Sequence, residues 1–262
     1  MRDIKGRLEG KVAIVIGAGS SGPGIGNGKA TSILFAREGA KVLLVDADIS
    51  RARETLTIIE NDGGNADVFQ ADVTQIGDSE NIVKSVVDRF GKLDILVNVV
   101  GILGLDTVVD VEEKDWDKIM DVNVKSVVLA SKFAIPKMIE SGGGSIINIS
   151  SIAGSRAYSA TPYTTSKAAI NGLTLSMAYD HGKDNIRVNA IAPGAVYTPM
   201  VAGILTTEQR GKRMESSMLG TEGTGWDVGW ASVYLASDES RWVTGTVLTV
   251  DAGITGMVPK LL

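Results

Sequence analysis

The feature that most constrains the fold is a regular alternation of short apolar runs with longer helix-like segments. The runs are rich in β-branched residues and apolar on both faces, as is typical of strands in a parallel sheet that helices cover on both sides. They span residues 12–16, 42–45, 95–97, 146–149, 186–191 and 247–250. The segments between them, which indicate helices, span residues 29–37, 51–61, 78–90, 112–139, 164–179 and 226–236. This order predicts an α/β fold with a doubly wound parallel sheet, a Rossmann fold.

The length of the chain is that of one domain. Its 262 residues are enough for one substantial core, and no stretch has the composition of a linker. We therefore expect a single domain over residues 1–262. One long segment, at about residues 197–225, has no clear period, and a loop of that length inside a compact domain is usually a lid or a substrate-binding element.

Charge and composition exclude several kinds of partner. A formal net charge of -5 provides no basic field for a polyphosphate, so we expect no nucleic-acid partner. The chain has no cysteine, which rules out disulfides and thiolate metal sites, and no metal site is predicted. No apolar run of about 18 residues and no apolar signal core in residues 1–7 is present, so we expect a cytoplasmic protein without a membrane partner.

A glycine-rich loop follows the first predicted strand directly. Residues 17–28 read GAGSSGPGIGNG, and a predicted helix opens at Lys29. Glycines at such a place let the backbone approach a pyrophosphate, while the helix N-terminus offers free N–H groups and a positive dipole end. The loop, together with its position between a strand and a helix, predicts a dinucleotide site.

The end of the second predicted strand carries an acidic residue, Asp46, which lies 18 residues after Gly28. A carboxylate there can accept hydrogen bonds from both ribose hydroxyls of an adenosine. Asp48 adds a second negative charge, and no arginine follows directly to bind a 2′-phosphate. The sequence therefore favours NAD over NADP. Lys29 is a cation that argues for NADP, but at the start of a helix it would face either the pyrophosphate or solvent.

A tyrosine and a lysine four residues apart open a later predicted helix. Tyr163 and Lys167 share one helix face at this spacing. A free tyrosine titrates near pH 10, and a nearby cation favours its phenolate. Ser150 and Ser151 end the preceding strand, at the carboxyl edge of the sheet where ligands of such folds bind. The combination indicates general acid–base chemistry on a hydroxyl or carbonyl group.

With these motifs in order, the chain resembles the short-chain dehydrogenase/reductase family over nearly its whole length. Further segments similar to family motifs are Ala71-Asp72-Val73, the run DILVNVVG at residues 94–101, DVNV at 121–124, and RVNAIAPG at 187–194 followed by Thr198. The resemblance implies a nicotinamide-dependent oxidoreductase that acts on a secondary alcohol or its ketone. It also implies a homotetramer, assembled through the helices around residues 112–139 and 164–179.

The resemblance implies four catalytic residues. Tyr163 would be the general base in oxidation and the general acid in reduction, and Lys167 would lower the pKa of Tyr163 and bind the nicotinamide ribose. Ser151 would position the substrate oxygen, and Asn123 would hold a water for a proton relay. The implied cofactor-binding residues are Gly17, Ser21, Gly26, Asn27, Asp46, Asp72, Val73, Asn98, Gly101, Tyr163, Lys167, Pro193, Gly194, Val196 and Thr198.

The chain departs from the family pattern in three places. The usual Gly-any-Gly falls on residues 26–28, which leaves about five more residues in the loop after Gly17, so the amides that would bind the pyrophosphate stay open. Val99 replaces a polar residue that normally braces the site, which leaves Asn98 for that task. The interval from the serine to the tyrosine is normal from Ser150 and one residue short from Ser151; Ser151 is preferred because the strand sets its position and a loop absorbs a deletion easily.

Several alternatives remain at this stage. A catalytically silent NAD(H) sensor would not need all four catalytic residues, and an enoyl-type reductase would be expected to space its tyrosine and lysine more widely. Arg156 and Tyr158 would face either solvent or the substrate, and an arginine there could meet a carboxylate. The side chains of the 197–225 segment would either line a substrate pocket or pack that segment onto the body. His181, at a helix end, is expected to be a solvated cap.

Overall fold

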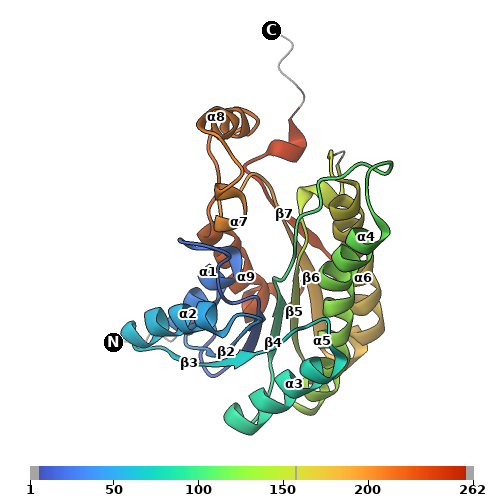
Figure 1. The fold of residues 1–262 in the computed structure, drawn as a ribbon. Coiled ribbons are helices and arrows are strands. Elements are labelled where there is room, and N and C mark those ends of the chain that lie inside the picture. Colours follow the sequence, from blue (N-terminus) through green and yellow to red (C-terminus); the bar gives the residue numbers. More distant parts are fainter. Residues whose placement is uncertain (1–5, 157, 258–262) are drawn as a thin grey trace.

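The computed structural model describes residues 6–156 and 158–257, and its centre is a seven-stranded parallel sheet (Figure 1). The strand order is β3-β2-β1-β4-β5-β6-β7. The strands are β1 (Val12–Ile16), β2 (Lys41–Asp46), β3 (Asn65–Gln70), β4 (Ile95–Asn98), β5 (Gly144–Ile149), β6 (Ile186–Pro193) and β7 (Val247–Val250). The predicted doubly wound α/β fold is confirmed, with the reversal of strand order between β1 and β4.

Strand β1 shows why the runs are apolar on both faces. Successive side chains of a strand point to opposite sides, and here Ala13 and Val15 enter one hydrophobic cluster while Val12, Ile14 and Ile16 enter the other. All five are almost completely buried. The sheet therefore separates two apolar cores, each of which a layer of helices closes.

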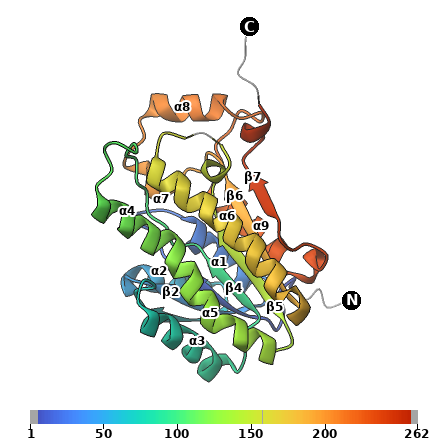
Figure 2. The same ribbon diagram turned by 90° about the vertical axis from the view of Figure 1, so that its right-hand side faces the viewer.

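Helices cover both faces of the sheet. On one face lie α1 (Asn27–Arg37), α2 (Ile49–Asn61) and α9 (Gly225–Ala236), and on the other lie α3 (Ile76–Phe90), α5 (Ser126–Glu140) and α6 (Thr161–His181) (Figures 1 and 2). The second layer faces the viewer in Figure 2. None of the helices within residues 6–156 and 158–257 combines the length and the apolar character needed to cross a membrane.

Strand β3 has no counterpart among the predicted runs. It reads NADVFQ and lies at the edge of the sheet, paired only with β2. An edge strand has less apolar contact than a central one, and the middle four residues of β3 are only partly buried. Asn65, Asp67 and Gln70 are tolerated there, so the apolar run that marks a central strand is missing.

The long helix predicted at residues 112–139 is divided by a π-helical turn. Helix α4 (Glu113–Met120) continues through the π-helical turn Asp121–Lys125 into α5. Turns of this kind are rare and often occur at functional sites. Asn123 lies within this turn and is buried.

The segment at residues 197–225 is more ordered than its sequence indicates. It contains α7 (Pro199–Ala202) and α8 (Thr207–Glu215). A capping box begins α8, since Thr206 accepts from the Gln209 amide and the Gln209 side chain accepts from the Thr206 amide. Helix α8 stands apart from the main helical layers, at the end of the molecule where the carboxyl ends of the strands point (Figure 1).

Candidate active site

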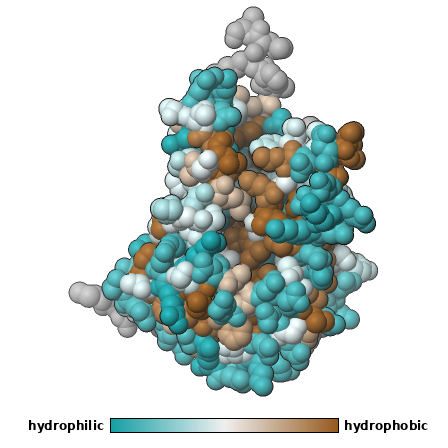
Figure 3. Space-filling view, in the orientation of Figure 1, coloured by the Kyte–Doolittle hydropathy of each residue, from teal (hydrophilic) through white to brown (hydrophobic). Residues whose placement is uncertain are grey.

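A cleft lies at the carboxyl edge of the sheet and has two lobes. The glycine-loop lobe, of about 360 Å³, is lined by residues of the loop after β1 and of the ends of β2 and β4. The tyrosine lobe, of about 410 Å³, is lined by residues that follow β5 and β6. Both lobes share Asn27, Val99, Gly101, Thr198 and Met200, so they form one continuous cleft. In Figure 3 apolar surface gathers in a hollow down the middle of this face.

The glycine-loop lobe is built by a close approach of helix α1 to strand β1. A Cβ atom on Gly28 would lie 1.8 Å from the carbonyl oxygen of Gly17, so only glycine fits there. Gly17 itself has a φ of +85°, which favours glycine. Helix α1 begins at Asn27, and its first N–H groups have no acceptor within the helix. The lobe therefore offers backbone donors to an anionic group.

Most residues expected to bind the adenosine and pyrophosphate line this lobe. The structure places Gly17, Ser21, Gly26, Asn27, Asp46, Asp72, Val73, Gly101 and Thr198 around it. The Gly26 amide donates to the Ser20 hydroxyl at 2.9 Å, which shapes the lengthened loop. The buried Oδ1 atom of Asn27 has no hydrogen-bond partner among the described residues. An unpaired buried amide oxygen is costly, and this one belongs to a residue that lines both lobes.

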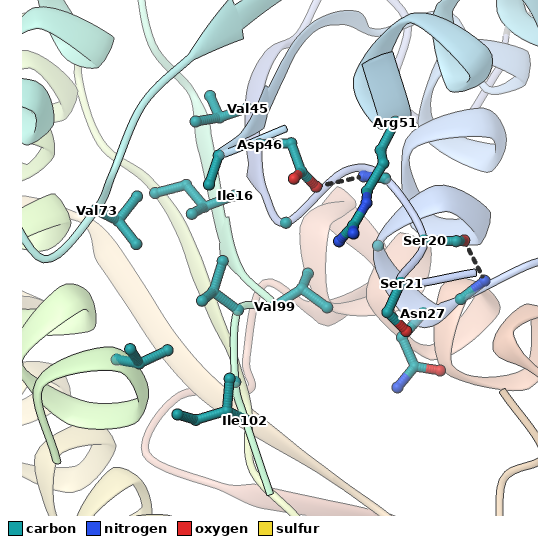
Figure 4. Close-up of a pocket in the computed structure, with 18 of the residues that line it drawn as sticks. Ile16, Ser20, Ser21, Asn27, Val45, Asp46, Arg51, Val73, Val99 and Ile102 are labelled. Atoms are coloured by element: carbon teal, nitrogen blue, oxygen red, sulfur yellow. Dashed lines mark hydrogen bonds between the residues drawn. The ribbon is translucent and has the colours of Figure 1, made fainter. Parts of the chain in front are cut away.

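Asp46 ends β2 beside the glycine loop. One carboxylate oxygen accepts from the Gly19 amide at 3.0 Å (Figure 4), and the other accepts from the Asp48 amide at 3.1 Å. These bonds hold the carboxylate in place, and each carboxylate oxygen keeps a further lone pair for another donor. The geometry suits recognition of a ribose diol.

Arg51 is a lining residue that the sequence did not indicate. It lies in α2, on the turn after β2, and its side chain projects between Asp46 and Ser21 in the view of Figure 4. Its guanidinium is paired with Asp48 at 3.2 Å. No arginine follows Asp46 directly in the sequence, but the first turn of α2 brings Arg51 back to the lobe five residues later.

The tyrosine lobe contains Ser151, Tyr163 and Lys167 together. Tyr163 and Lys167 lie in the first turns of α6, and the Lys167 Nζ atom is 5.7 Å from the centre of the Tyr163 ring. The ammonium donates to the Ile149 carbonyl at 2.8 Å, at the end of β5. Burial lowers the pKa of Lys167 to about 8. A cation is thus held beside the phenol.

Tyr163 and Ser151 form a second pair. Burial raises the pKa of the Tyr163 phenol, and a hydrogen bond with the Ser151 side chain opposes that shift. Ser150, by contrast, turns toward α6, where its hydroxyl bonds the Lys167 carbonyl at 3.0 Å and Asn171 Oδ1 at 2.7 Å. Of the two adjacent serines, Ser151 is therefore the one that faces the phenol.

The loop after β6 completes the tyrosine lobe. Pro193, Gly194, Val196 and Thr198 line it, as does Gly101 at the end of β4. A Cβ atom on Gly101 would lie 3.2 Å from Lys167 Nζ and 3.5 Å from Asn123 Oδ1. The residues of the two lobes fit a nicotinamide dinucleotide, with backbone donors and a carboxylate in one lobe and a phenol beside an ammonium in the other.

Two expected site residues do not line the cleft. Asn98, at the end of β4, donates from its amide to Asn148 Oδ1 at 2.9 Å, and Asn148 donates in turn to Thr174. Asn123 accepts from the Ile102 amide at 2.8 Å and donates to the Ile102 carbonyl at 3.0 Å. Their side chains brace the floor of the cleft from behind, rather than pointing into it.

Comparison with known proteins gives the class of the chain. A family model described as enoyl-(acyl carrier protein) reductase matches residues 21–255. The chain is 39% identical over 251 residues to 3-oxoacyl-(acyl-carrier-protein) reductase FabG of Thermotoga maritima. The alignment covers 95% of this chain and 99% of that protein. The chain belongs to the short-chain dehydrogenase/reductase family.

Solved structures agree with this membership. A short-chain dehydrogenase/reductase from Burkholderia xenovorans matches with a TM-score of 0.92 and 38% identity, covering 97% of this chain and 99% of that one. A 7α-hydroxysteroid dehydrogenase complexed with NADH and 7-oxo glycochenodeoxycholic acid matches with a TM-score of 0.89 and 35% identity. The match covers 94% of this chain and 95% of that one. The family defines a hydride-transfer oxidoreductase that binds a nicotinamide cofactor.

Proposed function

We propose that this protein is an NAD-dependent oxidoreductase that interconverts a secondary alcohol and its ketone. The observation that carries the proposal is the convergence of Ser151, Tyr163 and Lys167 in the tyrosine lobe. A protein that only sensed NAD(H) would need the glycine-loop lobe but not this arrangement of hydroxyl, phenol and ammonium. The nicotinamide, when bound, accepts or supplies the hydride.

The side chains of the tyrosine lobe account for the proton. In oxidation, the Tyr163 phenolate takes the proton of the substrate hydroxyl, and in reduction the phenol returns a proton to the carbonyl oxygen. The charge of Lys167, whose Nζ atom lies 5.7 Å from the centre of the Tyr163 ring, would favour the phenolate against the burial that raises the pKa of Tyr163. Ser151 donates to the same substrate oxygen and so orients the carbinol carbon toward the cofactor.

The surroundings of Asn123 and Gly101 are suited to carry the proton that Tyr163 exchanges with the substrate. Lys167 Nζ and Asn123 Oδ1 both lie against Gly101, since a Cβ atom built on that glycine would be 3.2 Å from the first and 3.5 Å from the second. Asn123 is held there by Ile102 and by a hydrogen bond to Ser166 at 2.9 Å. We propose that Asn123 positions a water that passes the proton from Lys167 toward solvent.

The preference for NAD rests on Asp46. Its carboxylate would accept from the ribose hydroxyls of NAD, whereas the 2′-phosphate of NADP would bring about two negative charges to the same place. The predicted preference is roughly ten- to hundredfold, after relaxation and salt reduce the repulsion. Arg51 at the same lobe acts in the opposite direction.

The test of the proposed function is the Tyr163→Phe variant. We expect it to bind NADH as the wild type does and to lose about two to four orders of magnitude in turnover, the usual contribution of a positioned acid–base group. Tyr179→Phe is the matched control, because Tyr179 lies on the same helix, is 90% exposed and does not line the lobe. Substrates are found by screening sterols, cyclic alcohols, sugars and hydroxy acids for NADH fluorescence. Near-normal turnover of Tyr163→Phe would refute the assignment.

Enoyl reduction is the second candidate, since the matching family model carries that description. The four-residue spacing of Tyr163 and Lys167 argues against it, because an enoyl-type reductase is expected to space the pair more widely. The assay compares NADH oxidation by a 2-enoyl thioester with that by the corresponding 3-oxoacyl thioester. We expect the enzyme either to reduce the 3-oxoacyl thioester alone or to reduce neither compound. Consumption of the enoyl compound alone would favour the alternative.

A further inference from the structure

The tyrosine lobe has a charge composition that the proposed reaction does not explain. Its described lining residues include three cations, Arg156, Lys167 and Arg213, and no aspartate or glutamate. Lys167 acts on Tyr163, but the two arginines have no part in the proton transfer. They come from segments far apart in the sequence, one before α6 and the other in α8.

Arg156 is held at the rim by a neutral partner. It lies between the short helical turn Ile152–Gly154 and α6, and its guanidinium donates to the carbonyl oxygen of Ile254. Ile254 lines the same lobe. Within residues 6–156 and 158–257 no carboxylate forms an ion pair with Arg156, so its charge remains available to a ligand.

Arg213 is held by a carboxylate that it must share. Its Nε donates to Glu222 at 2.7 Å, and Arg210 donates to the other oxygen of the same carboxylate at 2.8 Å. Glu222 is only 5% exposed. Two guanidinium groups on one buried carboxylate leave a net positive charge on this group of three residues. A further bond from Arg213 to the Val196 carbonyl, at 3.1 Å, fixes its guanidinium beside the lobe.

The remainder of the lobe is largely apolar. Besides the catalytic groups and the loop after β6, its lining includes Leu103, Ile152, Val196, Met200, Val201 and Ile254. An arginine presents a planar fork of donors that matches a carboxylate, and such charge-assisted bonds are stronger in an apolar surrounding. The lobe thus combines an apolar wall with two cations that neither Tyr163 chemistry nor cofactor binding uses.

We propose that the substrate is a hydroxy acid or oxo acid with an apolar segment, whose carboxylate binds Arg156 and Arg213. This proposal rests on the proposed function for the position of the reacting carbon, but the anion site is defined by the arginines alone. The apolar segment would lie along the wall between the two arginines and Tyr163. A neutral alcohol of the same shape would leave Arg156 without a counter-charge and the net positive charge of Arg210, Arg213 and Glu222 uncompensated.

The test compares acids with their methyl esters. A series of secondary hydroxy acids of increasing chain length and the matching esters is assayed with NAD. We expect the wild type to prefer the acids, and Arg156→Ala to lower the acid-to-ester ratio of kcat/KM by roughly ten- to hundredfold, the value of charge-assisted hydrogen bonds. Turnover of the esters should stay within about threefold of wild type. Equal use of acid and ester by the wild type would overturn the proposal.

A matched pair on α8 separates binding from structure. Arg210 and Arg213 share Glu222, but only Arg213 lines the lobe. Both alanine variants should lower the melting temperature, since each removes one bond to Glu222; Arg213→Ala also loses the bond to the Val196 carbonyl, and Arg210→Ala loses the stacking of its guanidinium on the Tyr197 ring. Only Arg213→Ala should produce the large loss of acid-to-ester preference. An equal loss of preference in both variants would reduce Arg213 to a structural role and contradict its part in the proposal.

A binding measurement distinguishes failure of this proposal from failure of the proposed function. Hexanoate is titrated into the protein saturated with NADH and followed by calorimetry. Saturable binding that Arg156→Ala abolishes supports the anion site, even if no alcohol or ketone is turned over. Absence of binding, together with turnover of neutral alcohols, would refute the anion site and leave the oxidoreductase intact.

Discussion

At the scale of the residue, Lys167, a proposed catalytic residue, has a charge that opposes folding. Its side chain is buried beside the Tyr163 ring, and among the described residues its ammonium has one protein acceptor, the Ile149 carbonyl. Burial lowers its pKa from 10.5 to about 8, so the folded protein holds this proton less tightly than the unfolded chain. The charged form is therefore unfavourable to folding, a cost that the proposed role of Lys167 beside the phenol would explain.

The consequence is a pH-dependent gain in stability when the charge is removed. We expect Lys167→Met to raise the free energy of unfolding at pH 7 by about 1–3 kcal/mol, less than the full pKa difference because the Ile149 carbonyl loses its donor. Below pH 8 the lysine is charged in both the folded and the unfolded chain, so the full free-energy cost of burying the charge applies. As pH rises to 10.5 this cost vanishes, so the stability gained by Lys167→Met should decrease between pH 8 and pH 10.5. Urea denaturation across this range is the measurement. Turnover and NAD affinity should both fall, and a variant that is destabilised at every pH would contradict the account.

Asp46 and Arg51 make a second prediction at this scale, for cofactor choice. Asp46→Asn should move the ratio of kcat/KM for NAD over NADP toward NADP by roughly tenfold, because the repulsion is removed while Arg51 remains to bind the phosphate. Adding Arg51→Ala should reverse part of that change. Steady-state kinetics of the single and double variants provide the ratios. No change in Asp46→Asn would mean that this carboxylate does not face the ribose.

At the scale of the element, the contact between α1 and β1 depends on one glycine. A methyl group on Gly28 would overlap the Gly17 carbonyl, and the atoms concerned are backbone atoms that cannot turn aside. The glycine-loop lobe exists because this contact brings the first amides of α1 close to the end of β1. Disturbing it should damage the fold and the cofactor site together.

We therefore expect Gly28→Ala to lower the free energy of unfolding by about 1–3 kcal/mol and to weaken NAD binding. Gly211→Ala is the control, since Gly211 lies within α8 and a Cβ atom there would meet nothing within 4 Å. That change should stabilise the protein by about 0.5–1 kcal/mol. Denaturation curves and NADH titrations of the two variants test this. A Gly28→Ala variant as stable as wild type would show that α1 can shift away from β1 without loss.

At the scale of the whole molecule, the outer faces of α5 and α6 carry apolar side chains that the chain itself does not cover. Val128 on α5 is 43% exposed, and Leu175 and Tyr179 on α6 are 55% and 90% exposed. Exposed apolar groups on adjacent helices often mark an interface between subunits. Figure 2 shows these two helices side by side on the face toward the viewer.

We predict a homotetramer that uses this face. Light scattering after size exclusion should give four times the mass of the chain, and Leu175→Glu with Val128→Lys should give a smaller species. Each substitution places a charge where apolar area would be buried, which should cost several kcal/mol across a symmetric interface. A Lys183→Glu variant, at the end of the same helix region, serves as the surface control. A monomeric wild type would refute the prediction.

Local pattern determined the architecture and the chemical class. Alternating apolar runs specify a parallel sheet because side-chain direction depends only on neighbouring residues, and the spacing of Tyr163 and Lys167 places them on one face for the same reason. The glycine loop was readable because a close backbone approach requires glycine wherever it occurs. These features depend on residues near one another in the chain.

Only the tertiary structure decided which distant residues meet. Ser150 and Ser151 are equivalent in sequence, and the packing of α6 against β5 alone turns Ser150 toward Asn171 and leaves Ser151 facing Tyr163. Strand β3 is stable because β2 supplies its hydrogen bonds, and the polar sequence of β3 does not by itself indicate this pairing. Arg156 and Arg213 reach one lobe because two separate segments fold over the same sheet edge. Such contacts depend on the positions of whole elements in space, and no local period encodes those positions.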